Sequence, residues 1–306
     1  MTADAASSPP DDLEDLLALA AAHGLDLVGS TLRTEEVGLD FRVAIAGATD
    51  GSRWVLRIPR RAEVLERAAV EGELLRTISP LLEIAVPDWR IRTTELIAYP
   101  LLPGSPGLTV RADGTVDWHV DMSSPAYAVS LGTAVARLHA IDAEVAAATG
   151  IEVRSPAQVR EVWARDLARV AASFSIAPEL RSRWEAWIAD DDLWPRHTVL
   201  THGELYPGHT LVEADEISAI IDWTTASIGD PAKDLMFHQV SAPPEMFDLA
   251  LRTYVAEGGT AWPRLAEHCT EMFSAGAIGY GIYALETGEA AHREAAAAEL
   301  DPSAAG

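Results

Sequence analysis

The sequence contains very little cysteine: of its 306 residues, only Cys269 carries a thiol. One cysteine cannot form an internal disulfide, and such chains are typical of reducing compartments. The first twelve residues have neither a basic residue nor an apolar run, which excludes a secretory signal, and no stretch has the apolar length of a membrane span. We therefore expect a soluble, monomeric, cytoplasmic protein, with a disordered tail over residues 1–12.

Positive charge is also scarce, with 23 Lys and Arg against 47 Asp and Glu and a formal net charge of −24. Proteins bind nucleic acid largely by neutralising phosphates with Lys and Arg, so nucleic acid is not expected as a partner, and neither is a membrane. The negative charge is compatible with a cationic amine substrate attracted to an acidic cleft. It also serves solubility alone, and the composition does not separate these two roles.

A hydrophobic content of 48% with 23% charged residues is typical of a globular chain. Apolar periodicity predicts an α+β fold, with a small β-rich lobe over residues 13–102 and a larger, mainly helical lobe over residues 103–306. Strands are expected within 26–33, 41–48, 52–59, 89–93 and 95–102. Helices are expected at 13–22, 62–78, 127–141, 156–173, 178–189, 245–257 and 262–286, and residues 290–306 are expected to form a fraying tail.

Polar chemistry is concentrated between Thr201 and Leu235, where His202, Glu204, His209 and Asp222 follow or precede short apolar runs. Such runs are typical of buried strands that deliver polar side chains to a cleft. His-Gly-Glu also begins a zinc deaminase signature, but that signature requires a later Pro-Cys-x-x-Cys, which a chain with one cysteine cannot supply.

The spacing of these residues follows that of protein kinases. Kinases place an Asp two residues after a histidine, an Asn five residues after that Asp, and a further Asp on the next hairpin. The first acid positions the substrate hydroxyl, and the other two residues hold Mg²⁺ against the phosphates. In this chain Glu204, His209 and Asp222 occupy those three places after His202.

The combination of HGELYPGH, IDW and GDPAKD resembles the aminoglycoside phosphotransferase-like kinases of small molecules. His209 after Tyr-Pro-Gly, together with WVLRIPRR at residues 54–61, is most similar to the macrolide phosphotransferase branch. The resemblance covers nearly the whole chain. It implies a bilobed protein-kinase-like fold and transfer of the γ-phosphate of GTP, or of ATP, to the 2′-hydroxyl of the desosamine sugar of a macrolide, with Mg²⁺ as cofactor and macrolide resistance as the result.

The resemblance also implies roles for single residues. Glu204, within its motif with His202, orients the acceptor hydroxyl and takes its proton, while Asp222 and His209 hold Mg²⁺. His209 alternatively contacts phosphate or a metal-bound water, because Mg²⁺ prefers oxygen ligands. Arg57 replaces the usual lysine that binds the phosphates and pairs with Glu71, for which the neighbouring Glu73 is a competitor.

Nucleotide contacts are implied in two segments. The loop after the first strand covers the phosphates through backbone amides, and Tyr99 to Gly104 forms the hinge that holds the nucleobase. The residues concerned are Leu39, Asp40 and Phe41 in the loop, Pro100 and Leu102 as backbone partners in the hinge, and Ile97 and Tyr99 beside the base. Backbone contacts do not distinguish ATP from GTP, and the resemblance favours GTP.

The helix predicted at 262–286 mixes glycines with aromatic residues. Glycine costs about 1 kcal/mol in a helix relative to alanine, so either close helix packing or a cavity is implied. A broad apolar wall for a macrolide, formed by Phe273, Tyr280 and Tyr283, fits the second possibility.

Two alternatives stay open. The first is a kinase of aminoglycosides or of another amino alcohol. The second is a nucleotide-binding pseudokinase, because Glu204 stands where the family pattern has Asp, and one extra methylene moves the carboxylate by roughly 1 Å.

Overall fold

The computed structural model describes residues 13–35, 40–111 and 114–305, so the tail predicted over residues 1–12 lies outside the described residues. The described chain forms two compact units. The first unit contains the residues up to His119 together with 207–224, and the second contains residues 120–206 and those from Thr225 onward. A lobe boundary after Leu102 stays a prediction.

The first unit is built on a five-stranded antiparallel sheet with the order β1-β2-β3-β5-β4. A tight turn with Gly51 at φ 88° joins the second and third strands, and the Asp50 carboxylate accepts a hydrogen bond from the Ser52 amide at 2.9 Å. The Asp-Gly hairpin that the sequence predicts is therefore present. The strands are β1 (Arg33–Glu35), β2 (Phe41–Gly47), β3 (Arg53–Pro59), β4 (Ile91–Arg92) and β5 (Ile97–Pro100).

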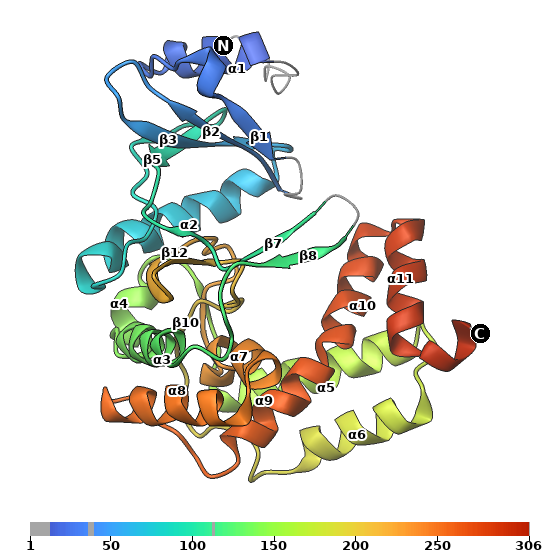
Figure 1. Cartoon of the computed structure of the whole chain (residues 1–306). Helices are drawn as coiled ribbons and strands as arrows, with labels where there is room; N and C mark the ends of the chain where they lie inside the picture. Colours follow the sequence, from blue (N-terminus) through green and yellow to red (C-terminus); the bar gives the residue numbers. More distant parts are fainter. Residues whose placement is uncertain (1–12, 36–39, 112–113, 306) are drawn as a thin grey trace. The chain divides into compact units, whose positions relative to one another are not determined.

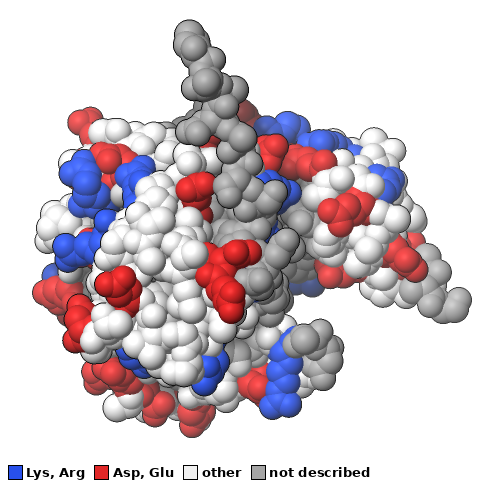
Figure 2. Space-filling model, turned by 90° about the horizontal axis from the view of Figure 1, so that it is seen from above, with Lys and Arg blue, Asp and Glu red and all other residues white. Residues whose placement is uncertain are grey.

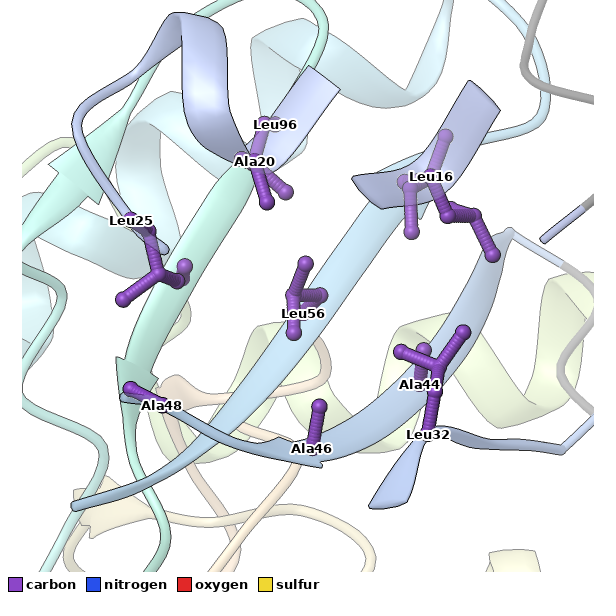
Figure 3. Close-up of a cluster of buried hydrophobic side chains, with 11 residues drawn as sticks. Leu16, Ala20, Leu25, Leu32, Ala44, Ala46, Ala48, Leu56 and Leu96 are labelled. Atoms are coloured by element: carbon purple, nitrogen blue, oxygen red, sulfur yellow. The ribbon is translucent and has the colours of Figure 1, made fainter. Parts of the chain in front are cut away.

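Helices cover both faces of this sheet (Figure 1). One face carries α1 (Leu13–Ala22), whose Leu16 and Ala20 pack on Leu56 of β3 and on a set of buried leucines and alanines (Figure 3). The opposite face packs against α2 (Val64–Ile78), whose Val64 and Ala68 contact Phe41 and Ile97. Alternation along each strand thus divides the strand residues between an apolar core and the face that carries Arg57.

Residues 26–33 do not form the strand that the sequence predicts. They contain a single 3-10 turn, η1 (Gly29–Thr31), and only Arg33 enters β1. The hydroxyl of Thr31 donates to the Val28 carbonyl at 2.6 Å and accepts from the Gly47 amide at 2.8 Å. Local side-chain bonds of this kind compete with strand pairing, which explains the difference.

The rest of the first unit consists of short elements. A second antiparallel sheet has the order β12-β11-β6, and β7 and β8 form a separate hairpin. The turn between β11 and β12 places Ala214 and Asp215 at φ 50° and 64°, the conformation that a two-residue hairpin requires. The elements are η2 (Ser79–Leu81), β6 (Ser105–Pro106), β7 (Leu108–Val110), β8 (Val116–Trp118), β11 (Thr210–Glu213) and β12 (Glu216–Ile220).

The second unit is mainly helical, with one small sheet of order β10-β13-β9. Helices α3 and α8 pack closely: a Cβ added to Gly132 would lie 2.4 Å from the Ala250 carbonyl oxygen. The strands are β9 (Glu152–Val153), β10 (Val199–Thr201) and β13 (Ser227–Gly229). The helices are α3 (Pro125–His139), α4 (Ala143–Ala147), α5 (Pro156–Ala171), α6 (Pro178–Ala189), η3 (Pro231–Asp234), α7 (Met236–Ser241), α8 (Pro244–Ala256), α9 (Leu265–Ser274), α10 (Gly276–Thr287), α11 (Ala290–Leu300) and η4 (Pro302–Ala305).

The C-terminal segment is better ordered than the sequence predicts. Residues 290–300, expected to fray, form α11, which lies beside α10 (Figure 1) and buries Ala296 and Leu300. The helix predicted over 262–286 is divided into α9 and α10 around Ala275. Within the described ranges, every helix is too short or too polar to cross a membrane.

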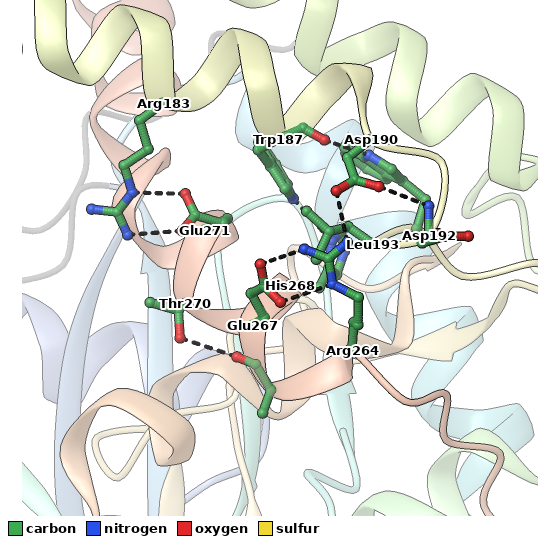
Figure 4. A network of polar contacts seen from close by, with 12 residues as sticks. Arg183, Trp187, Asp190, Asp192, Leu193, Arg264, Glu267, His268, Thr270 and Glu271 are labelled. Atoms are coloured by element: carbon green, nitrogen blue, oxygen red, sulfur yellow. Dashed lines mark hydrogen bonds and ion pairs between the residues drawn. The ribbon is translucent and has the colours of Figure 1, made fainter.

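Charged side chains of both signs are distributed over the face that Figure 2 shows, interspersed with uncharged residues. Several arginines at the surface are paired with acids, for example the half-buried Arg264 with Asp190 and Glu267 (Figure 4). Surface pairs of this kind contribute little to stability, typically about 0–1 kcal/mol each.

The glycines of α10 have different surroundings. A Cβ added to Gly281 would lie 3.0 Å from a methyl group of Val170 on α5, whereas one added to Gly279 meets nothing within 4 Å. Close helix packing therefore explains Gly281 but not Gly279.

We expect Gly279→Ala to stabilise the protein by about 0.5–1 kcal/mol, because alanine favours the helix and its methyl group enters open space. Gly281→Ala is the matched variant, and we expect it to be destabilising by about 1 kcal/mol or more because of the contact with Val170. Urea unfolding of the three proteins measures both effects, and equal midpoints for the two variants would contradict the packing described above.

His238 is buried in the helical unit, near the rings of Tyr127 and Phe247. Among the described residues, neither of its ring nitrogens has a hydrogen-bond partner. Burial lowers the pKa of His238 to about 4, and the Met246 carbonyl opposes this shift only in part. The folded state therefore holds this imidazole neutral at pH values where an unfolded chain has protonated it.

This depressed pKa predicts a pH-dependent stability. Between about pH 6.5 and pH 4 the unfolded chain binds a proton at His238 that the folded chain does not. The free energy of unfolding therefore decreases, by roughly 3 kcal/mol at most, as the pH is lowered from 6.5 to 4. Above pH 6.5 this contribution is constant. Denaturant unfolding at several pH values from 4 to 7 gives the free energy of unfolding as a function of pH. We expect this dependence to be weaker in His238→Leu than in the wild type, and unchanged in the exposed-site control His119→Gln.

Candidate active site

The first part of the candidate site is the β11–β12 hairpin in the first unit. His209 precedes β11 and Asp222 follows β12, and because the strands are antiparallel, the start of one lies beside the end of the other. The Ile221 amide donates to the His209 carbonyl at 3.0 Å, and the His209 Nε2 atom lies 3.7 Å from the Asp222 Oδ2 atom. The structure thus brings together the two residues predicted to hold a metal.

Asp222 adopts a left-handed backbone conformation, with φ 61°. Non-glycine residues rarely adopt this region, and they are enriched at functional sites. The Thr224 hydroxyl donates to the Asp222 Oδ1 atom at 2.6 Å, and the carboxylate is 43% exposed. The fixed backbone therefore presents this carboxylate to solvent in one orientation.

The donor set fits a magnesium ion only in part. In the described portion of the chain, no three His, Cys, Asp or Glu side chains come together as a metal-binding group. Mg²⁺ prefers oxygen ligands and is commonly bound by one or two carboxylates plus substrate phosphates. Asp222 fits that requirement as a single carboxylate ligand, and the imidazole of His209 fits it less well.

The second part of the site is a buried ion pair between β3 and α2 of the first unit. The Arg57 Nη1 atom on β3 donates to the Glu71 Oε1 atom on α2 at 2.7 Å, and both side chains are buried. The guanidinium centre lies 4.1 Å from the centroid of the Phe41 ring and 5.4 Å from that of Trp89. The competitor Glu73 pairs instead with Arg76 at the surface, so Glu71 is the partner that the sequence predicts.

Glu71 connects this ion pair to the hairpin. Its Oε1 atom also accepts a hydrogen bond from the Trp223 amide, next to Asp222, at 3.4 Å. Burial raises the pKa of Glu71, Arg57 lowers it and the negative charge of Asp222 raises it, with a net rise. Among the described residues the Glu71 Oε2 atom has no hydrogen-bond partner. The charge of Glu71 therefore depends on Arg57.

The residues predicted to bind nucleotide differ in their burial and in their contacts. Phe41 and Ile97 are buried in the cluster on the α2 side of the sheet, and Tyr99, two residues further along β5, is also buried. Burial raises the pKa of Tyr99 to about 12, so it is neutral at physiological pH. The Asp40 carboxylate is paired with Arg61 and Arg67 at 2.7 and 2.9 Å.

The predicted hinge follows directly from β5. Pro100 is the last residue of that strand and pairs with Trp54, and the Leu101 amide donates to the Arg53 carbonyl at 2.8 Å. This bond fixes the backbone just before Leu102. Leu39 lies outside the described residues.

The third part is the loop that carries Glu204 in the second unit, between β10 and residue 206. Glu204 is exposed, whereas His202 is fully buried and its Nδ1 atom lies 3.4 Å from the Glu204 amide nitrogen. Gly203 has φ 89°, and a Cβ on it would lie 2.4 Å from the Thr225 carbonyl oxygen. Only glycine fits this position, which explains the His-Gly-Glu order.

The Asp234 carboxylate fixes the same loop from the η3 turn. It accepts hydrogen bonds from the His202 amide at 2.9 Å and from the Gly203 amide at 2.8 Å, and the His139 Nε2 atom lies 3.1 Å from its Oδ2 atom. Burial alone would raise the pKa of Asp234, but the hydrogen bond and charge of His139 and the loop contacts lower it below its ordinary value. An ionised carboxylate therefore holds the backbone before Glu204.

Aromatic side chains lie close to this loop. The Tyr206 ring, two residues after Glu204, lies 5.3 Å from that of Phe237 on α7, which in turn lies 5.6 Å from that of Phe273 on α9. Phe273 is 43% exposed. These three rings form a partly exposed apolar group in the second unit, and of its members the sequence had indicated only Phe273.

The other two predicted wall residues belong to a different group. Tyr280 and Tyr283 stack on α10, and both contact the ring of His292 on α11. The Tyr280 hydroxyl and the His292 Nδ1 atom are 3.1 Å apart. Because residues 290–300 were expected to fray, the sequence gave no indication of His292.

Known proteins resemble this chain over most of its length. A crystal structure of macrolide 2′-phosphotransferase MphH from Brachybacterium faecium is 72% identical, covers 96% of this chain and 99% of its own, and superposes with a TM-score of 0.92. A macrolide 2′-phosphotransferase type I is 41% identical, with coverage of 98% and 99% and a TM-score of 0.88. The viomycin phosphotransferase of Streptomyces vinaceus is 29% identical over 246 residues, 76% of this chain and 78% of that protein.

These similarities confirm the α+β kinase-like fold, with its β-rich N-terminal part and helical C-terminal part. Residues 31–268 match the model of the phosphotransferase enzyme family, and this range includes each of the three parts of the candidate site. The chain belongs to the phosphotransferase enzyme family.

Proposed function

We propose that this protein is an antibiotic-modifying kinase that transfers the γ-phosphate of GTP, with ATP as the alternative donor, to the 2′-hydroxyl of the desosamine sugar of macrolides. The observation that carries the proposal is the 72% identity, over 96% of the chain, to a macrolide 2′-phosphotransferase. Phosphorylation of that hydroxyl would confer macrolide resistance. The cytoplasmic location and monomeric state predicted from the sequence belong to the same proposal.

The contacts of Glu204 suit the role of a general base. Its side chain is exposed, while the backbone before it is held by the Asp234 carboxylate and by Thr225, whose hydroxyl donates to the His202 carbonyl at 3.0 Å. A fixed carboxylate can accept the proton of a bound hydroxyl and orient its oxygen for attack on phosphorus. His202 acts by holding the loop, since its ring is buried.

The nucleotide end of the reaction is assigned to the first unit. Arg57, kept charged by Glu71, would contact phosphate oxygens, and Asp222 with His209 would hold Mg²⁺. When bound, Mg²⁺ neutralises the charge of the phosphates. The hinge at Pro100 and Leu102 would meet the nucleobase, with Ile97 and Tyr99 beside it.

The apolar group formed by Tyr206, Phe237 and Phe273 favours a macrolide over an aminoglycoside. A macrolide has a large apolar ring that gains free energy when aromatic surface covers it, whereas an aminoglycoside is a polycation that requires several acids. Tyr280 and Tyr283 would extend the same contact. The similarity to a viomycin phosphotransferase keeps a kinase of another antibiotic as the second candidate.

A transfer assay tests the proposal. We expect the protein, Mg²⁺ and GTP to add one phosphate to an erythromycin-type macrolide and none to kanamycin, with ATP compared in parallel and acceptor mass as the measurement. Phosphate on kanamycin alone would support the second candidate. Nucleotide binding without transfer to either acceptor would support a pseudokinase and contradict the proposal.

The role of Glu204 generates a separate prediction. We expect Glu204→Gln to lower kcat by about 10²-fold to 10⁴-fold without changing nucleotide affinity, since the amide keeps the shape but cannot accept the proton. Glu204→Asp keeps a carboxylate displaced by roughly 1 Å and should retain more activity than Glu204→Gln. Equal kcat values for Glu204→Gln and the wild type would show that another group is the base.

A further inference from the structure

Two aspartates flank the η3 turn, and each is paired with a buried histidine. The Asp230 Oδ2 atom lies 2.8 Å from the His268 Nε2 atom, and the Asp234 Oδ2 atom lies 3.1 Å from the His139 Nε2 atom. All four side chains are buried. The two pairs are therefore chemically alike and lie within one turn of chain.

The pairs differ in what else their carboxylates hold. The second oxygen of Asp230 accepts from the Ala232 amide of its own turn at 2.9 Å, which is a local cap. Asp234 instead accepts from the backbone amides of His202 and Gly203, the two residues that precede Glu204. Only the Asp234 pair is thus joined to the loop that carries the predicted base.

His139 is itself held in one orientation. Its Nδ1 atom lies 3.0 Å from the hydroxyl oxygen of Tyr254, whose ring meets the imidazole edge to face. The Thr260 amide donates to the Tyr254 oxygen, and a Cβ on Gly259 would lie 2.3 Å from the Tyr254 ring. The tyrosine is therefore fixed, and it holds the His139 ring in one orientation.

In this orientation the Nε2–H group of His139 donates to Asp234, because an ionised carboxylate only accepts hydrogen bonds. The Oδ2 atom of Asp234 then receives donors from His139 and from the His202 amide, and the Oδ1 atom receives the Gly203 amide. Loss of the His139 donor would leave a fully buried carboxylate short of partners, and such a group tends to take up a proton. A protonated oxygen cannot accept from a backbone amide as before, so the loop would shift.

We propose that His139 and Tyr254 are positioning residues that set the place of Glu204 through Asp234 and the His202–Gly203 backbone. The proposal rests on the proposed function, in which Glu204 acts on the acceptor hydroxyl. Tyr254 holds His139, His139 holds Asp234, and Asp234 holds the loop. Neither His139 nor Tyr254 contacts a substrate in this scheme.

Kinetics of phosphate transfer provide the first test. We expect His139→Leu to lower kcat by about 10²-fold, the cost of a misplacement of about 1 Å, with the KM values for GTP and macrolide within about twofold. His139→Gln should recover most of the loss, because its amide N–H₂ can replace the Nε2 donor. Tyr254→Phe removes only the hydroxyl oxygen that holds His139, so we expect it to lower kcat by about tenfold. This variant also tests the proposal if His139→Leu does not fold.

The second pair supplies the matched control. His268→Leu also removes a buried histidine from an aspartate of the same turn, and Trp187, whose indole donates to the His268 Nδ1 atom at 3.0 Å, lies beside it (Figure 4). We expect a loss of thermal stability comparable to that of His139→Leu, with kcat within about twofold of the wild type. If kcat falls equally in both variants, or in neither, the proposal is wrong.

Amide hydrogen exchange tests the same scheme without turnover. The peptide that contains residues 200–206 should exchange faster in His139→Leu than in the wild type, and at the wild-type rate in His268→Leu. The reason is that His139, and not His268, supports the Asp234 carboxylate that accepts from the His202 and Gly203 amides. Unchanged exchange in His139→Leu would overturn the positioning role. Absence of transfer by the wild type would overturn the proposed function alone, since exchange still decides the role of His139.

Discussion

A buried carboxylate must be supplied with hydrogen-bond donors, and both units meet this requirement with groups from distant segments. In the first unit Glu71 receives Arg57 from β3 and the Trp223 amide from the segment after β12. In the second, Asp234 receives two amides of the loop after β10 and the ring of His139. Removal of one partner of a buried ion pair such as Arg57–Glu71 is strongly destabilising, typically by about 3–5 kcal/mol.

Burial alone raises the pKa of both carboxylates, but their net pKa shifts have opposite directions. Asp234 is fully surrounded by donors and its pKa is lowered, whereas the pKa of Glu71 is raised and one of its oxygens has no partner among the described residues. The negative charge of Asp222 contributes to the rise in the pKa of Glu71. Any cation that neutralises Asp222 therefore favours the ionised form of Glu71 and its pairing with Arg57. Asp222, the predicted metal ligand, and the Arg57–Glu71 pair are therefore coupled electrostatically.

Much of this organisation could be predicted from the sequence because the relevant signals are local. The 3.6-residue period predicted α1 with its observed bounds, and the Asp-Gly turn predicted the β2–β3 hairpin. Arg57 with Glu71, and His209 with Asp222, are brought together as their spacing in a known pattern implied. Their roles in binding remain predictions.

The failures have a different physical origin. Nothing local in the sequence indicates that His139 meets Asp234, 95 residues away, or Tyr254, 115 residues away. The alanine-rich segment at 290–300 is helical because α10 offers a surface for Ala296 and Leu300, and tertiary packing of this kind cannot be read from propensity. Phe237, the middle ring of the apolar group beside Glu204, was missed for the same reason.

The division of the chain has a consequence for biosynthesis. The first unit includes residues 207–224, so the strand β6 obtains its partner β11, and Glu71 obtains the Trp223 amide, only after residues 120–206 of the second unit have been translated. Domains generally fold as units while the ribosome proceeds from the N-terminus. The N-terminal unit of this protein can follow that order only in part. Its five-stranded sheet uses strands within residues 33–100, but β6 lacks β11, and Glu71 lacks the Trp223 amide, until Thr224 has left the ribosomal tunnel.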